Sequence, residues 1–362
     1  MKKKLSILSL VLVLVLSLAL TGCGSDDGAT TGGDGDEGEA LKVAMVTDEG
    51  GVNDQSFNQS AWEGLQQAED ELGVSVSYQE SQQEADFAPN FETVIDAEND
   101  LVWGIGYKLA SAGYEAALAN PDVKFGLVDQ SFDGDTEAFP EGTPENMIGV
   151  VFKAEQPSFL VGYIAGRMTE TDKVGFVGGI EGDVIWGFDY GYQAGVQYAA
   201  DELEKEIEVV SQYADSFGDA AKGKSIATNM YQQGMDIVFH AAGGVGDGVI
   251  EAAKEQDKWV IGVDRDQNYM APDHVLTSAM KRVDVGVYNV TKDLKEGNYK
   301  GGQTVVYGLE DGGAVDIAPT SDKNVPAEIL EKIEEIKQLI IDGEIEVPFN
   351  QETYEEWLET LN

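Results

Sequence analysis

The stretch Thr47-Asp-Glu-Gly-Gly-Val-Asn-Asp-Gln-Ser-Phe-Asn58 joins two segments of different periodicity, and the fold follows from that junction. Before it, the short apolar run Leu41–Val46 predicts a buried strand. After it, apolar residues recur at spacings of three and four from Phe57 to Leu72, which predicts an amphipathic helix. We therefore expect a strand-to-helix loop, in which two adjacent glycines supply conformational freedom.

Three side chains of this loop have the chemistry to contact a ligand. Asp54 is a hydrogen-bond acceptor, Phe57 offers a flat apolar ring, and Asn58 carries an amide. In open parallel α/β sheets, ligands bind outside the carboxyl ends of the strands, where such loops lie. Taken singly, each residue fits a structural role equally well, because Asp54 or Ser56 can cap the helix and Phe57 can pack in the core.

The N-terminus has the composition of an export signal. Three lysines precede the run Leu5–Leu20, which only serines interrupt and which is too short for a comfortable membrane span. The run ends at Leu20-Thr-Gly-Cys23, which resembles a bacterial lipobox, although an ordinary secretory signal with a chance cysteine is the alternative. We expect residues 1–22 to be a lipoprotein signal peptide and Cys23 to be the lipidated first residue of the mature chain.

Residues 23–40 are expected to form an acidic, glycine-rich tether. From Gly24 to Ala40 there are six glycines, six acidic residues and no large apolar side chain, so burial cannot offset the entropy of ordering. From Leu41 onward about 320 residues remain, more than one hydrophobic core usually serves. The chain is therefore expected to contain two lobes.

The overall charge excludes nucleic acid as a partner. The chain has 67 acidic and 23 basic residues, and without the three lysines of the signal peptide 20 basic residues face the same 67 acids, a net charge of −47. Such a surface repels nucleic acid and anionic lipid. The acids are dispersed rather than gathered in one block, a composition that suits high salt. Cys23 is the only cysteine, which excludes a disulfide within one chain.

Strand-like runs and helical stripes alternate along the rest of the chain in two series. The first series has strand-like runs at Val74–Tyr78, Leu101–Ile105, Lys124–Val128 and Asn146–Val151. The second has them at Lys173–Val177, Ile207–Tyr213, Asp236–His240, Trp259–Val263 and Val275–Met280, with helices expected over Gly187–Leu203 and Val249–Glu255 among others. This alternation predicts an α/β fold of two doubly wound, Rossmann-like lobes. The tail is too short for a third domain, and we expect it to cross again between the lobes.

Polar residues follow several of these strands. Asp129 follows the run Lys124–Val128, Asp264 follows Val263, and Lys281 follows Val275–Met280. The glycine-rich run from Gly243 to Gly248 has neither dinucleotide-fingerprint spacing nor a P-loop lysine, and it fits a nest of N–H donors for ligand oxygens. Since the carboxyl ends of parallel strands meet at one edge of a sheet, two facing lobes would enclose these residues in a cleft.

Enzyme chemistry finds little support in the sequence. His240 and His274 are the only histidines, and neither stands beside a serine in a nucleophile elbow. There is no H-E-x-x-H motif and no cysteine cluster. We expect no catalytic residue, no metal site and no cofactor.

Four passages together resemble the basic membrane protein family, lipoproteins that serve ABC importers as purine nucleoside receptors. They are Gly50–Gly64, Phe159–Gly166, Asp236–Gly244, and Val260–Gln267 with Ser278–Asp284. The resemblance implies a type I periplasmic-binding fold with a hinge, an interlobe cleft and three crossings, placed near residues 152, 282 and 318. The lobes would then comprise residues 41–152 with 283–318, and residues 153–282 with 319–362.

The resemblance also implies roles for single residues. Phe57 and Phe188 would stack on the two faces of a purine, although Trp186 lies two residues from Phe188 and could replace it. The base edge would be bound by Asp54, Asn58 and Asp129, and the ribose hydroxyls by Asp264 and Lys281, with the Gly243 and Gly244 backbone nearby. Carboxylates and aromatic faces have the chemistry for these contacts.

The resemblance implies a lipid-anchored, monomeric receptor on the extracytoplasmic face of the cell membrane that delivers its ligand to an ABC permease. Two alternatives stay open. A receptor of the same fold for a sugar or another small signal would also use aromatic walls. A nucleoside hydrolase would need a carboxylate cluster that chelates Ca²⁺. A repressor of this fold is disfavoured, since the chain has a secretion signal and no helix-turn-helix.

Overall fold

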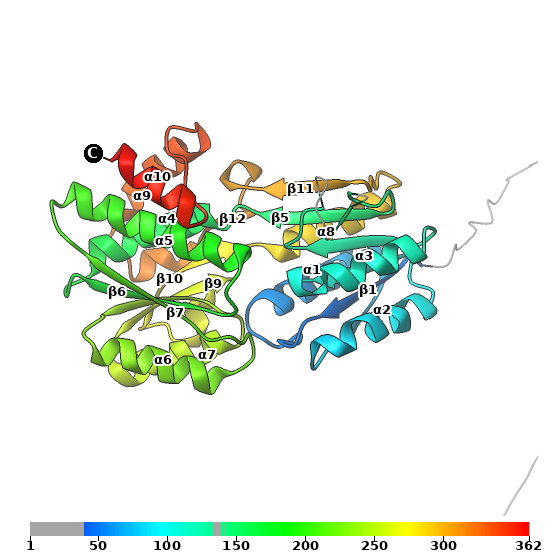
Figure 1. Ribbon diagram of the computed structural model, residues 1–362, viewed down its shortest axis with the longest axis horizontal. Coiled ribbons are helices and arrows are strands. Elements are labelled where there is room, and N and C mark those ends of the chain that lie inside the picture. Colours follow the sequence, from blue (N-terminus) through cyan, green and yellow to red (C-terminus); the bar gives the residue numbers. More distant parts are fainter. Residues whose placement is uncertain (1–39, 133–138, 141, 362) are drawn as a thin grey trace, which may run out of the picture. The chain divides into compact units, whose positions relative to one another are not determined.

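The computed structural model describes residues 40–132, 139–140 and 142–361. Within them the chain forms two six-stranded sheets, each accompanied by helices (Figure 1). The predicted signal peptide, Cys23 and all of the tether but Ala40 lie outside these residues. No helix in the described ranges combines the length and the apolar character that a membrane span requires.

The first sheet has the strand order β11-β5-β4-β3-β1-β2, with all strands parallel. Its strands are β1 (Lys42–Thr47), β2 (Ser75–Gln79), β3 (Leu101–Ile105), β4 (Lys124–Val128), β5 (Met147–Phe152) and β11 (Gln303–Tyr307). Its helices are α1 (Phe57–Leu72), α2 (Phe87–Asp96), α3 (Ala110–Ala119) and α8 (Val283–Lys295). Alternate residues of β1 enter cores on opposite faces of this sheet, Val43 and Met45 on one face and Ala44 and Val46 on the other.

The second sheet repeats this order as β12-β10-β9-β8-β6-β7, with β12 antiparallel to β10. Its strands are β6 (Lys173–Gly178), β7 (Glu208–Tyr213), β8 (Ile237–Ala241), β9 (Trp259–Asp264), β10 (Val275–Lys281) and β12 (Val315–Ile317). Its helices are α4 (Glu155–Met168), α5 (Asp183–Glu202), α6 (Ala220–Gln232), α7 (Val245–Gln256), α9 (Ala327–Ile341) and α10 (Gln351–Thr360). The α/β fold of two Rossmann-like lobes predicted from the sequence is confirmed.

Two helices begin one turn earlier than their sequence pattern predicts. α5 starts at Asp183 rather than Gly187, and α7 starts at Val245 rather than Val249. Gly246 and Gly248 in the first turn of α7, and Gly182 and Gly187 on either side of the first turn of α5, lower the helical signal. In the fold they permit close packing, because a Cβ at Gly248 would lie 1.8 Å from the Ala220 carbonyl oxygen.

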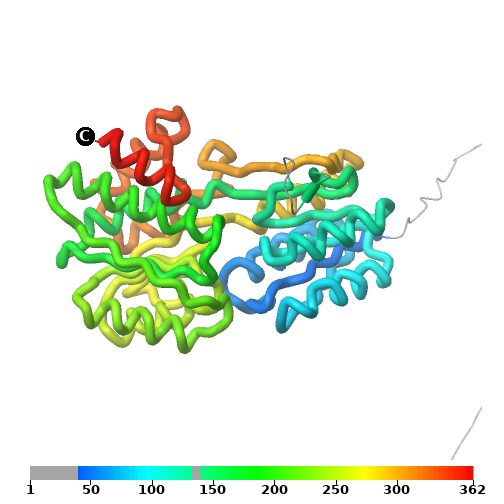
Figure 2. Tube along the Cα trace, viewed as in Figure 1, coloured from blue at the N-terminus to red at the C-terminus, as the bar shows by residue number. Residues whose placement is uncertain are grey.

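The chain passes between the lobes three times (Figure 2). The passages follow Phe152 and Lys281, and the third lies between Tyr307 and Val315. The third passage lies earlier than the crossing expected near residue 318, because β12 already pairs with β10 in the second sheet. A strand of three residues is too short to show a periodicity in the sequence. The remaining lobe boundaries stay a prediction.

Candidate ligand-binding site

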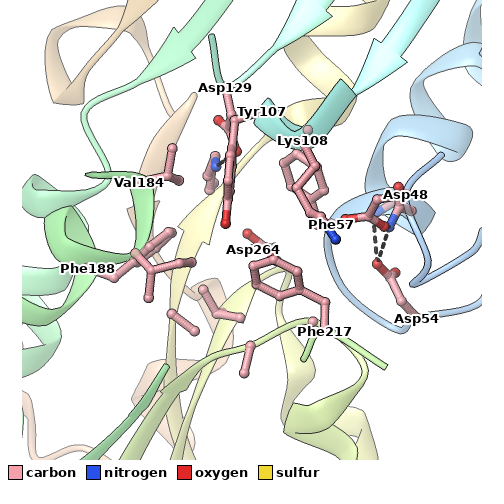
Figure 3. Close-up of a pocket in the computed structure, with 18 residues that line it drawn as sticks. Asp48, Asp54, Phe57, Tyr107, Lys108, Asp129, Val184, Phe188, Phe217 and Asp264 are labelled. Carbon is pink, nitrogen blue, oxygen red and sulfur yellow. Dashed lines mark hydrogen bonds and ion pairs between the residues drawn. The ribbon is translucent and has the colours of Figure 1, made fainter. Parts of the chain in front are cut away.

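A pocket lies between the lobes, at the carboxyl ends of their strands (Figure 3). The space among its side chains, part of it open to solvent, is about 520 Å³. Eight of the nine predicted ligand-binding residues line it, namely Asp54, Phe57, Asn58, Asp129, Phe188, Gly243, Asp264 and Lys281. The ninth, Gly244, does not line it and immediately precedes α7. The roles of these residues toward a ligand stay predictions.

A buried ion pair connects the lobes inside the pocket. Lys281, the last residue of β10, places its Nζ 2.5 Å from Oδ2 of Asp129, which follows β4 in the other lobe. The two side chains are only 2% and 7% exposed. The same Nζ lies 4.8 Å from the ring centroid of Phe57 and 5.6 Å from that of Phe188. Cation–π attraction to both rings therefore adds to the ion pair in holding the ammonium in place.

Asp264 occupies the place in the second sheet that Asp129 occupies in the first. Each ends the fourth strand of its sheet, counted from the β2 or β7 edge, with left-handed backbone at φ 64° and 67°. Aspartate tolerates this conformation better than most residues, and it turns both carboxylates toward the pocket side. The Ser56 hydroxyl donates to Asp264 across the lobes. Burial raises the pKa of Asp264 to about 7, against the opposing effects of Lys281 and Ser56.

Asp54 organises the loop before α1. Its carboxylate accepts the backbone N–H groups of Ser56, Asn58 and Gln59 at 2.9, 2.9 and 3.0 Å, so it caps the helix as well as lining the pocket. The Asn58 amide nitrogen donates to Asp48 Oδ1 at 2.8 Å and to Asp54 Oδ2 at 3.0 Å. This arrangement commits the donor side of Asn58. Its Oδ1 is buried and has no hydrogen-bond partner among the described residues.

Ten of the residues that line the pocket were not predicted as ligand-binding, and four of these have polar or aromatic side chains: Asp48, Tyr107, Lys108 and Phe217. Asp48 directly follows β1. The reasoning that identified Asp129, that a polar residue directly after a strand lies at the ligand-binding edge of the sheet, applies to Asp48 as well. Burial raises its pKa to about 6. Tyr107 follows Gly106, whose φ of 107° only glycine adopts readily and which turns the chain after β3. Phe217 lies in a loop without periodicity, and no pattern indicated it.

The second aromatic wall is formed by Phe188. Figure 3 shows Phe57 and Phe188 on opposite sides of the pocket. Trp186, the alternative considered from the sequence, does not line the pocket, and its indole nitrogen lies 3.4 Å from Glu181 Oε1. Phe217 adds a further ring from the second lobe, 6.4 Å from the Tyr107 ring at an interplanar angle of 79°.

Further contacts join the lobes outside the pocket. Arg265 donates to both carboxylate oxygens of Glu63 at 2.8 and 2.9 Å. Gln55 receives hydrogen bonds from Gln267 at 3.1 Å and from Tyr269 at 2.6 Å. Gln267 also lies 3.1 Å from His240 Nε2, and burial lowers the pKa of His240 to about 4. His240 is therefore a neutral core residue that supports this contact.

Residues 41–351 match the family described as ABC transporter substrate-binding protein PnrA-like. The chain belongs to this family. A CD4+ T-cell-stimulating antigen from Listeria innocua is 42% identical to it over 96% of this chain and 99% of its own length. Basic membrane protein A from Borreliella afzelii is 38% identical, with 91% and 98% covered. A crystal structure of an ABC transporter solute-binding protein from Aeropyrum pernix K1 has a TM-score of 0.78 at 28% identity, covering 89% of this chain and 97% of that chain.

The resemblance to the basic membrane protein family, drawn from four sequence passages, is thereby confirmed. This PnrA-like protein is a substrate-binding protein of an ABC transporter and not an enzyme, so the hydrolase alternative is wrong. Membership implies a small-molecule ligand and a permease partner. Solute-binding proteins of ABC transporters are extracytoplasmic, and the names of the relatives indicate association with a membrane.

Proposed function

We propose that this protein is a lipid-anchored receptor that captures a purine nucleoside between its lobes and delivers it to an ABC permease. The observation that carries the proposal is the pair of rings on opposite sides of the pocket, Phe57 and Phe188, with buried carboxylates beside them. A purine presents two flat faces, and stacking on an aromatic side chain contributes about 1–3 kcal/mol per base.

The ribose is assigned to the polar group around Lys281. Asp264 and Asp129 supply buried acceptors for hydroxyl donors, and an ammonium has three donors, so Lys281 can bind hydroxyl oxygens while paired with Asp129. This assignment moves Asp129 from the base edge, where the resemblance placed it, to the ribose end. The 2.5 Å contact with Lys281 leaves little room for the two residues to serve opposite ends of one ligand.

The base edge is assigned to Asn58 and the acids beside it. Since the Asn58 nitrogen is engaged by Asp48 and Asp54, its Oδ1 would accept from a ring N–H or an exocyclic amine. Asp54 supports the base edge mainly by fixing the loop.

The charges favour a nucleoside over a nucleotide. Within the described part of the chain, no arginine lines the pocket. Of its two lysines, Lys281 pairs with Asp129, and Lys108 lies 2.6 Å from Glu49 and 3.3 Å from Glu84. A phosphate would therefore meet carboxylates without the bidentate cation that usually binds it.

A purine nucleoside should raise the melting temperature of the purified protein and be recovered intact. Binding to the folded state alone stabilises it by mass action, by about 2.7 kcal/mol at a free concentration of 100 Kd. Titration calorimetry with adenosine, guanosine, ribose and a hexose, followed by mass spectrometry of the recovered ligand, tests this. Binding of the hexose but of no nucleoside would replace the proposal with the sugar-receptor alternative.

Phe57→Ala tests whether Phe57 stacks on the ligand or packs in the core. Phe57 is only half-buried, so the change should cost little apo stability while weakening nucleoside binding by about 1–3 kcal/mol. Phe159→Ala is the control, because Phe159 is fully buried in the core of the second lobe and its loss should cost about 3–5 kcal/mol of stability. A large fall in apo stability of Phe57→Ala with unchanged affinity would make Phe57 a core residue.

The lipid anchor rests on the lipobox-like ending at Cys23. Cys23→Ala should yield an uncleaved or released protein, because no thiol is left to carry the lipid. Membrane fractionation and intact mass measure this. Unchanged fractionation and mass would contradict the anchor.

A further inference from the structure

The side chains that line the pocket offer many acceptors. Four carboxylates line it, those of Asp48, Asp54, Asp129 and Asp264, together with the unpartnered Oδ1 of Asn58. Ribose hydroxyls and ring N–H groups can donate to such oxygens. The acceptor atoms of a purine, its unprotonated ring nitrogens and any 6-oxo group, can bind only to a donor.

Donors are scarce among the lining side chains. The Asn58 amide nitrogen donates to Asp48 and Asp54, and Lys108 pairs with two glutamates. Lys281 pairs with Asp129 at the end assigned to the ribose. The Tyr107 hydroxyl is buried and has no hydrogen-bond partner among the described residues. Leaving such a group unsatisfied is costly in a folded protein.

The Tyr107 ring has a packing partner in the opposite lobe. Gly106 turns the chain at the end of β3, and the edge-to-face contact with Phe217 holds the ring from the opposite lobe. Figure 3 shows the Tyr107 hydroxyl reaching into the space between Phe57 and Phe188. A base stacked between those rings would therefore present its edge to this hydroxyl.

From this geometry we propose that Tyr107 is a specificity-determining residue, whose hydroxyl donates a hydrogen bond to an acceptor atom of the bound purine. The inference rests on the proposed function and adds a donor for the base edge, since Lys281 is assigned to the ribose and the Asn58 amide nitrogen and Lys108 are already paired. A tyrosine hydroxyl is protonated at neutral pH, and burial, reinforced by the nearby charges of Asp129 and Asp48, raises the pKa of Tyr107 further to about 12.

Tyr107→Phe removes only the hydroxyl and keeps the ring contact with Phe217. We expect it to bind the preferred nucleoside about tenfold more weakly, the loss of one hydrogen bond. The acceptor is identified with a panel of purine nucleosides in which N1, N3 or N7 is replaced by CH, or in which the 6-oxo group is absent. Wild type should bind the analogue that lacks the acceptor about tenfold more weakly than the parent nucleoside. For that analogue, the affinities of wild type and Tyr107→Phe should be equal.

Tyr192→Phe is the matched control. The Tyr192 hydroxyl is also buried and has no hydrogen-bond partner among the described residues. It lies in the core of the second lobe, however, and does not line the pocket. This variant should bind every nucleoside as wild type does. If Tyr107→Phe binds the preferred nucleoside as tightly as wild type does, the proposed role of Tyr107 is wrong and the proposed function stands. The same holds if the substitution lowers the affinity for every analogue by the same factor. If wild type binds no nucleoside, the proposed function fails and this inference with it.

Discussion

Lys281→Met should lower the free energy of unfolding of the ligand-free protein by about 3–5 kcal/mol, because it leaves the Asp129 carboxylate buried without its cation. Methionine preserves the length and most of the volume of the side chain, so a cavity contributes little to the loss. The variant should also lose nucleoside binding, since the ammonium lines the pocket close to the rings of Phe57 and Phe188 and is assigned to the ribose. Urea unfolding followed by circular dichroism measures the first effect, and calorimetry the second.

Two variants show whether the buried pair is the cause. Adding Asp129→Asn to Lys281→Met removes both charges and should restore most of the lost stability. Lys108→Met makes the same substitution at a more exposed pair, whose partners Glu49 and Glu84 are 26% and 73% exposed, and should cost less than about 1 kcal/mol. Equal losses for Lys281→Met and Lys108→Met would contradict the burial argument.

Asp264→Asn should stabilise the ligand-free protein at pH 8 and leave it nearly unchanged at pH 4. The pKa of Asp264 is raised from 3.8 to about 7, so the folded state binds this proton more tightly than the unfolded state. Its contribution to stability is present below pH 4 and is lost as the pH rises through 7. At about 1.36 kcal/mol per pKa unit, the ionised carboxyl costs roughly 4 kcal/mol at pH 8, and asparagine does not ionise.

The measurement is urea unfolding of wild type and variant from pH 4 to pH 8. Asp48 retains its own raised pKa of about 6 in both proteins, so part of the pH dependence should persist in the variant. Asp273→Asn, a change at an exposed carboxyl of the same lobe, is the control and should follow the wild-type profile. A stability difference between Asp264→Asn and wild type that does not vary with pH would contradict the proposed cause.

Much of the fold and part of the pocket could be predicted from local pattern. Asp129 and Asp264 could be predicted because each follows an apolar run that is typical of a strand. The alternation of strand-like runs with helical patterns predicts parallel strands, whose carboxyl ends meet at a common edge of the sheet. Lys281 was found by the same rule. The pattern could not show that Lys281 and Asp129 pair, because that contact depends on how two lobes meet and not on either strand.

Two of the residues that were missed lie in segments that no local pattern marks as part of a site. Phe217 lies in a loop without periodicity, and Tyr107 lies in a turn that an isolated glycine creates. Asp54 shows a further limit, since one carboxylate both caps α1 and lines the pocket. Sequence alone offers these as alternatives, whereas the fold permits both at once.

The third passage between the lobes has a consequence for the order of folding. β11 completes the first sheet from residues 303–307, far along the chain from β5, and β12 completes the second from residues 315–317. Neither sheet has all of its strands until the chain is almost fully synthesised, so the lobes cannot mature one after the other as independent units.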